Sequence, residues 1–316
     1  MEKKKHKFRR FLVKVFLIIA VIAGLWCVLV GHFYKKMNFK EVMAVSGEPL
    51  KEDGVTNILL IGNDSRTAGE DGRSDAMILV SISDKTKTIH MTSLLRDMYV
   101  EIPGYEGNRL NAAYSFGGAE LLMKTIEDNF DMEVNRFVQV NFQAFADVVD
   151  AVGGVELEVT NEEVKLINAY LDEYNILEDR PQGTDYLAEN LQGVLHLNGP
   201  QALSYCRNRY IGTDFGRTER QRKVLGAMVN RAPWVLLHMD EVSDVFENVT
   251  TNLSQAECTW LSSQLAKIAT YDIVQGSIPL EDTYTNATIR GMAVLSVDFE
   301  ANNAYIRKEI YGQDIK

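Results

Sequence analysis

Cysteine and histidine are scarce in this chain of 316 residues, which limits the chemistry that it can carry. There are three cysteines and five histidines. With Cys27 inside a long apolar run, the odd cysteine count provides no disulfide framework, although Cys206 and Cys258 leave one pair open. The histidines are scattered, and none has the spacing of a zinc site or of a His-Glu-x-x-His helix. A zinc enzyme is therefore not indicated.

Motifs of the common nucleophilic and nucleotide-dependent enzymes are missing as well. There is no Gly-x-Ser-x-Gly elbow, no cysteine and histidine at a suggestive spacing, and no Gly-x4-Gly-Lys phosphate loop. The chemistry must then come from arginines and carboxylates, the groups that neutralise and position a phosphoryl group during its transfer.

Basic residues are few beyond the amino terminus. The chain has 33 lysines and arginines against 44 aspartates and glutamates, a net charge of −11. Seven basic residues and one acid stand among the first 14 positions, which leaves 26 basic and 43 acidic residues from position 15 onward. A domain with this balance repels nucleic acid, so no nucleic-acid partner is expected.

A long apolar run follows the basic amino terminus. Residues 15–30 are sixteen apolar residues without interruption, and residues 11–31 are long enough to cross a hydrocarbon core of about 30 Å as a helix. No small-x-small cleavage site stands at residues 28–32, so an uncleaved signal anchor is favoured over a cleaved signal peptide.

The charge beside this run predicts its orientation. Basic residues precede it, which keeps the amino terminus in the cytoplasm, while Trp26 and Tyr34 suit the outer interface. We therefore expect a single-pass protein of the cell membrane with an extracytoplasmic domain. The expected parts are a cytoplasmic tail at 1–10, a transmembrane helix at 11–31, a stalk at 32–54 and a catalytic domain at 55–316.

The remaining sequence alternates between apolar runs and amphipathic segments, without internal repeats. Strands are predicted at 57–62, 77–83, 89–95, 155–159 and 289–297. Helices are predicted from amphipathic spacing and a capping box at 119–130, 142–152, 160–170, 200–205, 217–228 and 298–310, and a second capping box at 254–257 marks a further helix start. Residues 175–190, rich in Asp, Glu, Gly and Pro, are expected to form a loop or lid. The alternation favours a single α/β layered domain.

Two carboxylates stand where predicted strands end and begin. Asp64 and Arg66 directly follow the strand at 57–62, and Asp75 directly precedes the next strand. The carboxyl ends of strands border the ligand crevice of an open α/β sheet, so converging carboxylates there could hold a hard cation such as Mg²⁺. A structural alternative is that Asp64 caps a turn and Asp75 pairs with Arg73.

Arginines form the densest cluster of the sequence. Five of them stand within sixteen residues of an otherwise acidic domain: Arg207, Arg209, Arg217, Arg220 and Arg222. Guanidinium groups match phosphate oxygens bidentately, which indicates an anion site, and a solvated basic face is the alternative. Two further cations stand apart from the cluster, Arg96 beside Asp97 at the end of a predicted strand and Arg109 in an expected loop.

These motifs, in this order behind one amino-terminal anchor, resemble the LytR-CpsA-Psr family of bacterial cell-wall proteins. The likeness covers about residues 55–232. The segments that carry it are 57–66, 73–75, 93–97, 109–114, 152–155, 197–203, and 207–221 with its Arg-x-Arg and Asp-x-x-Arg-x-x-Arg-Gln patterns. Two positions depart from the family pattern. Leu95 replaces a proline, which is expected to loosen the presentation of Arg96, and Arg109 replaces a lysine.

The resemblance implies a three-layer α/β/α domain with a mixed central sheet, whose apolar interior accommodates a polyprenyl chain. It implies a phosphotransferase that moves teichoic acid, capsular or related polysaccharide from an undecaprenyl-pyrophosphate carrier to a peptidoglycan hydroxyl. Pyrophosphate contacts are implied for Arg66, Arg96, Arg207, Arg209, Arg217, Arg220 and Gln221.

The metal and the orienting groups are also implied by the resemblance. Asp64 and Asp75 would hold Mg²⁺, or Mn²⁺ in its place, and with Arg96 they would form the catalytic set. Asp97 and Asp214 would orient the arginines. A hydrolase of polyprenyl pyrophosphate and a non-enzymatic envelope regulator or transcriptional attenuator are the alternatives.

Overall fold

The computed structural model describes residues 24, 26–42, 53–63, 74–235 and 243–313. Within these residues, no helix is both long enough and apolar enough to cross a membrane. The predicted tail at 1–10 and most of the predicted span at 11–31 lie outside the described residues. Residues 26–34 are helical and lead into the domain.

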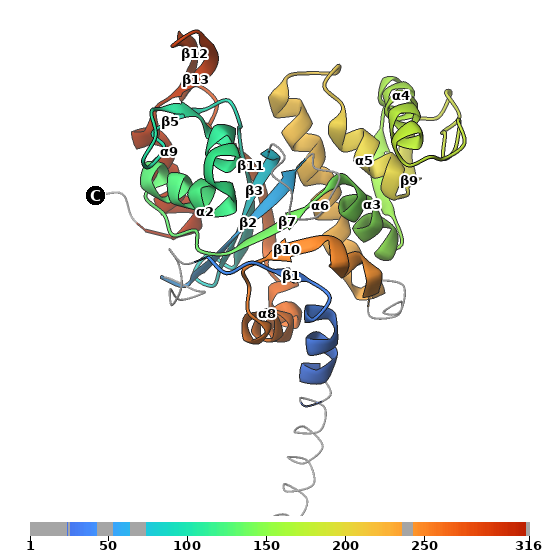
Figure 1. Ribbon diagram of the computed structural model, residues 1–316, viewed down its shortest axis with the longest axis horizontal. Coiled ribbons are helices and arrows are strands. Elements are labelled where there is room, and N and C mark those ends of the chain that lie inside the picture. Colours follow the sequence, from blue (N-terminus) through green and yellow to red (C-terminus); the bar gives the residue numbers. More distant parts are fainter. Residues whose placement is uncertain (1–23, 25, 43–52, 64–73, 236–242, 314–316) are drawn as a thin grey trace, which may run out of the picture.

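The centre of the domain is a mixed sheet with the strand order β1-β10-β7-β2-β3-β4-β11 (Figure 1). Antiparallel pairs join β2 to β3, β3 to β4 and β7 to β10, and parallel pairs join β2 to β7, β4 to β11 and β1 to β10. The strands are Asn38–Phe39 (β1), Val55–Asn63 (β2), Ser74–Ser83 (β3), Thr88–Leu94 (β4), Phe137–Val140 (β7), Val249–Thr251 (β10) and Asp272–Ile278 (β11). This confirms the predicted mixed α/β domain with a central mixed sheet.

Four strands of this sheet run in the same direction. Because β2 and β4 each pair antiparallel with β3, they are parallel to one another, and β7 and β11 follow them through parallel pairs. Their last residues therefore share one edge of the sheet, which we call the carboxyl edge: Asn63, Leu94, Val140 and Ile278. The first residue of β3, Ser74, pairs with Asn63 at the same edge.

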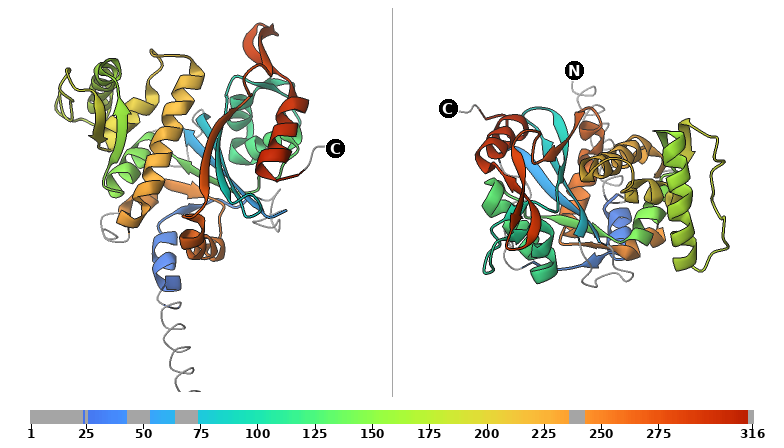
Figure 2. Two further views of the ribbon diagram at one scale, coloured as in Figure 1. Left: turned by 180° about the vertical axis from the view of Figure 1, so that it is seen from behind. Right: turned by 90° about the horizontal axis from the view of Figure 1, so that it is seen from above.

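Helices cover both faces of the sheet (Figures 1 and 2). On one face, α2 (Leu110–Phe130) and α9 (Phe299–Tyr305), with the single turn η3 (Ile306–Ile310), pack on the main core. Leu59 and Leu79 of the sheet share this core with Leu122, Ile126 and Ile306, all of them at most 1% exposed. This core binds the sheet to its first helical layer.

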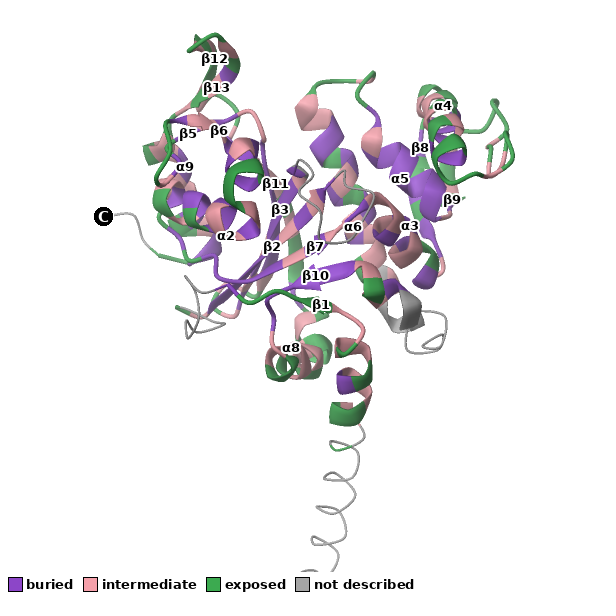
Figure 3. Cartoon of the chain, viewed as in Figure 1, coloured by how far each residue is buried: buried purple, intermediate pink, exposed green. Residues whose placement is uncertain are grey.

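The other face carries α3 (Phe142–Ala151), α5 (Gly199–Arg207) and α6 (Asp214–Val235). Outside them lie α4 (Asn161–Leu177) and the hairpin of β8 (Val155–Val159) and β9 (Gly193–Leu197). A second core joins these elements, with Val149, Val164, Leu171, Leu197 and Val224 at its centre. The burial colours of Figure 3 show the same interior.

The remaining elements are short strands, a hairpin, a turn and a helix. Two short strands, β5 (Tyr99–Val100) and β6 (Asn108–Arg109), pair beside the hairpin of β12 (Tyr284–Ile289) and β13 (Met292–Val297). The turn η2 (Ser243–Asn248) precedes β10, and helix α8 (Gln255–Ile268) precedes β11.

Local signals place most helix starts correctly. The expected capping boxes are present at the starts of α4 and α8, where Thr160 and Ser254 accept hydrogen bonds from the backbone N–H groups of Glu163 and Glu257. Helix α4 extends to Leu177, so the first residues of the predicted loop at 175–190 are helical instead.

Two predicted elements differ from the structure. Arg109, expected in a loop, ends the short strand β6 and is the N-cap residue of α2. Helix α2 begins at Leu110 and bends at Gly117 and Gly118, where Gly118 has φ 65°. The predicted strand at 289–297 begins later, as β13 at Met292, and it pairs with β12 in a hairpin whose turn residues Arg290 and Gly291 have φ values of 54° and 79°. Consecutive positive φ angles of this kind match the twist of a two-residue hairpin.

Candidate functional site

An apolar cavity of about 520 Å³ lies between the sheet and the helices α3, α5 and α6. Strands β2, β3 and β7 line it with Leu60, Ile78 and Val138, and the helices line it with Phe145 and Leu225. A concave, mostly apolar site with a few polar groups is the usual form of a ligand pocket. The cavity is large enough for part of a hydrocarbon chain.

Every charged side chain among the described residues that line this cavity is an arginine. Arg207 is the last residue of α5, Arg209 follows in the loop between α5 and α6, and Arg217 lies in the first turns of α6. Gln221, one helical turn after Arg217, lines the cavity beside it. The structure thus brings together four of the predicted pyrophosphate-binding residues.

Helix α5 is fixed so that it presents Arg207 at its carboxyl end. Asn198 and Gln201 form a capping box at its start. The backbone N–H of Gly199 donates to Oδ1 of Asp150 on α3 at 2.6 Å. A Cβ at position 199 would lie 2.1 Å from a carbonyl oxygen of α3, so the close approach of the two helices requires glycine. Burial raises the pKa of Asp150, and the Gly199 N–H opposes this rise.

Arg207 is held by side chains from two other helices. Its Nη2 lies 2.9 Å from Oε1 of Glu173 on α4. Its guanidinium carbon lies 4.8 Å from the ring centre of Phe142 and 5.4 Å from that of Tyr170. Cation–π contacts of this kind orient a guanidinium while leaving its edge available for an anion. The sequence does not indicate these three residues, since nothing in their local pattern links them to Arg207.

A series of ion pairs crosses the carboxyl edge and ends at the cavity. Asp97 accepts from Arg109 at 3.2 Å and lies 3.4 Å from Nε of Arg96. Asp214 lies 3.3 Å from the same Nε and 3.5 Å from Nη2 of Arg217. Arg96 at the end of β4 is thereby connected to Arg217 on α6 through one carboxylate. Both aspartates contact two arginines each, which is the geometry that an orienting role requires.

The two remaining arginines of the cluster lie elsewhere. Nη2 of Arg220 donates to the carbonyl oxygens of Asn208 at 2.7 Å and Ile211 at 2.9 Å, and Nη1 lies 3.8 Å from Glu163. Arg222 donates to Oγ of Ser93 at 2.7 Å, and burial lowers its pKa. Neither lines the cavity. The structure thus places Arg220 outside the cavity lining, where it holds the loop between α5 and α6.

The side chains of the predicted metal ligands, Asp64 and Asp75, are not among those that the structure describes. Asp64 and Arg66 lie outside the described residues, and Asp75 lies within β3 with its side chain not described. The backbone of Asp75 follows Ser74, which pairs with Asn63 at the carboxyl edge. Among the described residues, no group of three or more His, Cys, Asp or Glu side chains could hold a metal ion.

The two cysteines of the domain are free thiols in the cavity lining. Cys206 is buried on α5 and Cys258 is partly buried on α8. Burial raises the pKa of Cys258 to about 11 and raises that of Cys206 further, so both stay protonated at neutral pH. The pair left open by the sequence is therefore not a disulfide here, and both thiols serve as apolar lining.

Comparison with known proteins agrees with this geometry. The sequence pattern of the LytR_cpsA_psr family matches residues 32–307. The chain belongs to this family. Among its relatives, Biofilm regulatory protein A of Streptococcus mutans is 33% identical over 83% of this chain and 68% of its own length.

Two other relatives of the LytR-CpsA-Psr family carry the name polyisoprenyl-teichoic acid–peptidoglycan teichoic acid transferase TagU. The Enterococcus faecalis protein is 32% identical over 85% of this chain and 84% of its own length. The Bacillus cereus protein is 34% identical over 68% of this chain, and the match spans 64% of its own length. Several relatives are therefore matched over slightly less than two thirds of their length.

Solved structures of the LytR-CpsA-Psr family share the fold. TagT bound to LIIa-WTA superposes with a TM-score of 0.66 at 27% identity, covering 85% of this chain and 94% of that one.

One departure from the LytR-CpsA-Psr pattern can now be placed. Leu95 is 3% exposed, and its backbone N–H donates to the carbonyl of Ile278 on β11 at 2.9 Å. A proline could not make this bond. The leucine therefore adds a hydrogen bond and core packing beside Arg96, and both argue against a looser presentation of this arginine.

Proposed function

We propose that this chain is a phosphotransferase that moves a glycopolymer from a polyprenyl-pyrophosphate carrier to peptidoglycan at the outer face of the cell membrane. The observation that carries the proposal is the cavity, whose walls are apolar and whose only described charges are Arg207, Arg209 and Arg217. A ligand that suits it has a hydrocarbon tail and a strongly anionic head. Relatives named as teichoic acid transferases support the same assignment.

The chemistry follows from the two ends of such a donor. The hydrocarbon chain would lie along the apolar walls, and the arginines would bind the diphosphate oxygens. An acceptor hydroxyl would attack the phosphorus that carries the glycopolymer and form a new P–O bond. The bond to the bridging oxygen would break, releasing polyprenyl phosphate, and a carboxylate would accept the hydroxyl proton. Arginines that neutralise the developing charge stabilise such a transition state.

The proposal includes a divalent cation, which Asp64 and Asp75 would bind. Carboxylates beside phosphate oxygens form the oxygen-rich environment that Mg²⁺ prefers. When bound, the cation would supply positive charge to the phosphate oxygens. Chelation by EDTA should abolish transfer and added Mg²⁺ should restore it, with Asp75→Asn raising the Mg²⁺ concentration required. Full activity of metal-free protein would remove the cation from the proposal.

The test of the function uses the full chain in membranes, a labelled lipid-linked glycopolymer and peptidoglycan. Arg207→Ala is expected to reduce transfer by about 100-fold or more, since it removes one of the charges that neutralise the transition state. The matched control is Arg307→Ala, because Arg307 pairs with Asp131 outside the cavity. Equal activity of the two variants would refute the proposed site.

Product analysis separates transfer from the alternatives. Label attached to glycan strands supports transfer, whereas release of free polymer phosphate would indicate a polyprenyl-pyrophosphate hydrolase. A chain that turns over neither substrate yet changes envelope gene expression would indicate a regulator.

A further inference from the structure

Tyr210 stands almost fully in solvent beside the arginines of the cavity. It directly follows Arg209, which lines the cavity, and it is 80% exposed. Its ring centre lies 6.3 Å from that of Tyr170, a second member of the cavity lining. The ring centre of Tyr170 is in turn 5.4 Å from the guanidinium carbon of Arg207. Two aromatic rings therefore lead outward from an arginine of the proposed diphosphate site.

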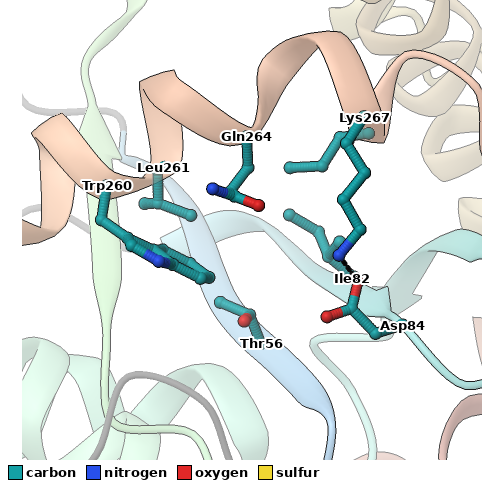
Figure 4. Close-up of a pocket in the computed structure, with 8 residues that line it drawn as sticks. Thr56, Ile82, Asp84, Trp260, Leu261, Gln264 and Lys267 are labelled. Atoms are coloured by element: carbon teal, nitrogen blue, oxygen red, sulfur yellow. Dashed lines mark hydrogen bonds and ion pairs between the residues drawn. The ribbon is translucent and has the colours of Figure 1, made fainter. Parts of the chain in front are cut away.

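Two other exposed aromatic side chains rest on protein. Tyr105, which is 52% exposed, stacks on Phe116 with 4.8 Å between the ring centres. Trp260, which is 40% exposed, lies over Thr56 in the small gap between α8 and the sheet (Figure 4). Tyr210 is the most exposed of the three, and the ring next to it meets it at 44° and not face to face. Its aromatic face is therefore accessible to a ligand.

The backbone around Tyr210 is fixed, although the side chain is exposed. Oδ1 of Asn208 accepts from the backbone N–H groups of Tyr210 at 2.9 Å and Ile211 at 3.2 Å. The carbonyl oxygens of Asn208 and Ile211 both accept from Arg220 on α6. Because the loop is already held on both sides of the ring, a ligand that orders this ring loses little entropy.

A carboxylate stands beside the two rings. Glu173 is one helical turn after Tyr170 on α4, and its Oε1 lies 2.9 Å from Nη2 of Arg207. The Glu173 side chain is 52% exposed, so its carboxylate can also accept hydrogen bonds from a ligand. A pyranose ring suits such a place, because its C–H groups are attracted to the negative face of an aromatic ring and its hydroxyls donate to carboxylates.

We propose that Tyr210 is the stacking surface of a subsite for the first sugar of the glycopolymer, with Glu173 accepting from the hydroxyls of that sugar. The inference rests on the proposed function, because the arginines must hold the diphosphate to which the sugar is joined. In such a donor the hydrocarbon tail and the sugar leave the diphosphate at opposite ends. With the tail in the apolar cavity, the sugar lies outside it beside the arginines, where Tyr210 stands. The subsite would favour glycopolymer donors over bare polyprenyl diphosphate.

Binding of two probes to the full chain, measured by calorimetry, tests the subsite. One probe is farnesyl diphosphate, and the other is the same lipid diphosphate joined to a single N-acetylglucosamine. Tyr210→Ala is expected to raise the Kd of the sugar-bearing probe by about 2- to 12-fold, the equivalent of one lost aromatic contact. The Kd of farnesyl diphosphate should not change, which also shows that the variant is folded. Tyr210→Phe should bind both probes normally, since the ring face makes the contact.

The matched control is Tyr105→Ala, which removes an exposed tyrosine that stacks on α2 and does not line the cavity. It should leave the Kd of both probes unchanged. If the unaltered chain binds farnesyl diphosphate and Tyr210→Ala weakens both probes equally, or neither, the sugar subsite is refuted while the proposed function stands. If neither probe binds the unaltered chain, the diphosphate site is refuted, and the subsite with it.

Transfer kinetics distinguish a donor sugar from an acceptor sugar. Tyr210→Ala should raise KM for the lipid-linked donor and leave kcat nearly unchanged, because the ring contact is made equally in the bound donor and in the transition state. A rise confined to the KM for peptidoglycan would overturn the assignment to the donor and place the acceptor at Tyr210.

Discussion

Two sets of arginines from one sixteen-residue segment have different surroundings. Arg207, Arg209 and Arg217 line the cavity, whereas Arg220 and Arg222 bond to a loop and to the sheet. Arg217, Arg220 and Arg222 are nearly equally buried, at 3%, 6% and 7% exposed, so burial does not separate Arg217 from the other two. The difference lies in what each guanidinium faces.

The periodicity of α6 produces this division. Positions 217, 221, 225 and 228 line the cavity as one stripe, at the spacing of a single helix face. Each residue advances about 100° around the helix, so positions 220 and 222 leave that stripe on opposite sides. Arg220 then meets the loop carbonyls, and Arg222 meets Ser93 on β4. Clustering in the sequence therefore overstates the number of arginines that line the cavity.

The largest loss of transfer activity is expected from a substitution of Arg217. Arg217→Gln keeps most of the side-chain volume but removes the charge, so transfer should fall by about 100-fold or more. The variant should remain folded, as measured by circular dichroism and thermal unfolding. If transfer persisted near the level of the unaltered chain, the arginines that line the cavity would not be the ones that bind the pyrophosphate.

Arg220→Ala is expected to affect stability first. It leaves two carbonyl oxygens, those of Asn208 and Ile211, without their donor. The cost is about 1–3 kcal/mol for each such group that stays buried. Each kcal/mol lowers the Tm by about 2–4 °C in a domain of this size. Thermal unfolding and transfer per folded molecule are the two measurements.

This variant also decides between two roles for Arg220. A transfer rate per folded molecule within a few-fold of the unaltered chain is expected if Arg220 only holds the loop. A loss of transfer as large as that of Arg217→Gln, with an unchanged Tm, would instead assign Arg220 to the pyrophosphate site. The two sets of arginines would then not differ in function.

Much of this arrangement could be predicted from local sequence. The apolar run of β2 and the capping boxes of α4 and α8 each depend on neighbouring residues, and the structure has all of them. Arg217 and Gln221 have the i and i+4 spacing of a shared helix face, and both line the cavity. The resemblance grouped Arg220 with them, and its i and i+3 spacing from Arg217 did not argue against that grouping.

The partners of these residues could not be predicted, because they come from distant segments. Glu173, Phe142 and Tyr170 reach Arg207 only through the packing of α3 and α4 against α5. The hairpin of β12 and β13 was missed for a local reason, since β12 is mostly polar and only its last residue, Ile289, was joined to the apolar run of β13. The glycine at position 291 was the available signal, as glycine inside a strand pattern often marks a turn or bulge.

The smallest change in activity is expected at the hairpin of β12 and β13. It contacts the segments that carry Asp97 and Asp214, the carboxylates that pair with Arg96 and Arg217. The ring of Tyr284 stacks on Phe215 at 5.3 Å, next to Asp214, and the N–H of Leu295 donates to the carbonyl of Asp97 at 2.9 Å. An aromatic pair contributes about 0.5–1.5 kcal/mol, so its loss would allow Asp214 more freedom to leave Arg96 and Arg217.

Tyr284→Ala should therefore lower kcat/KM for transfer by about 2- to 12-fold, the rate equivalent of that energy. Tyr284→Phe should restore it, since the ring and not the hydroxyl makes the contact. The control is Thr288→Ala, an exposed position on the same strand nearer the turn, which should leave kcat/KM unchanged. Equal losses in all three variants would assign the hairpin a general structural role. A loss confined to Tyr284→Ala would show that Arg96 and Arg217 depend on their orientation as well as on their charge.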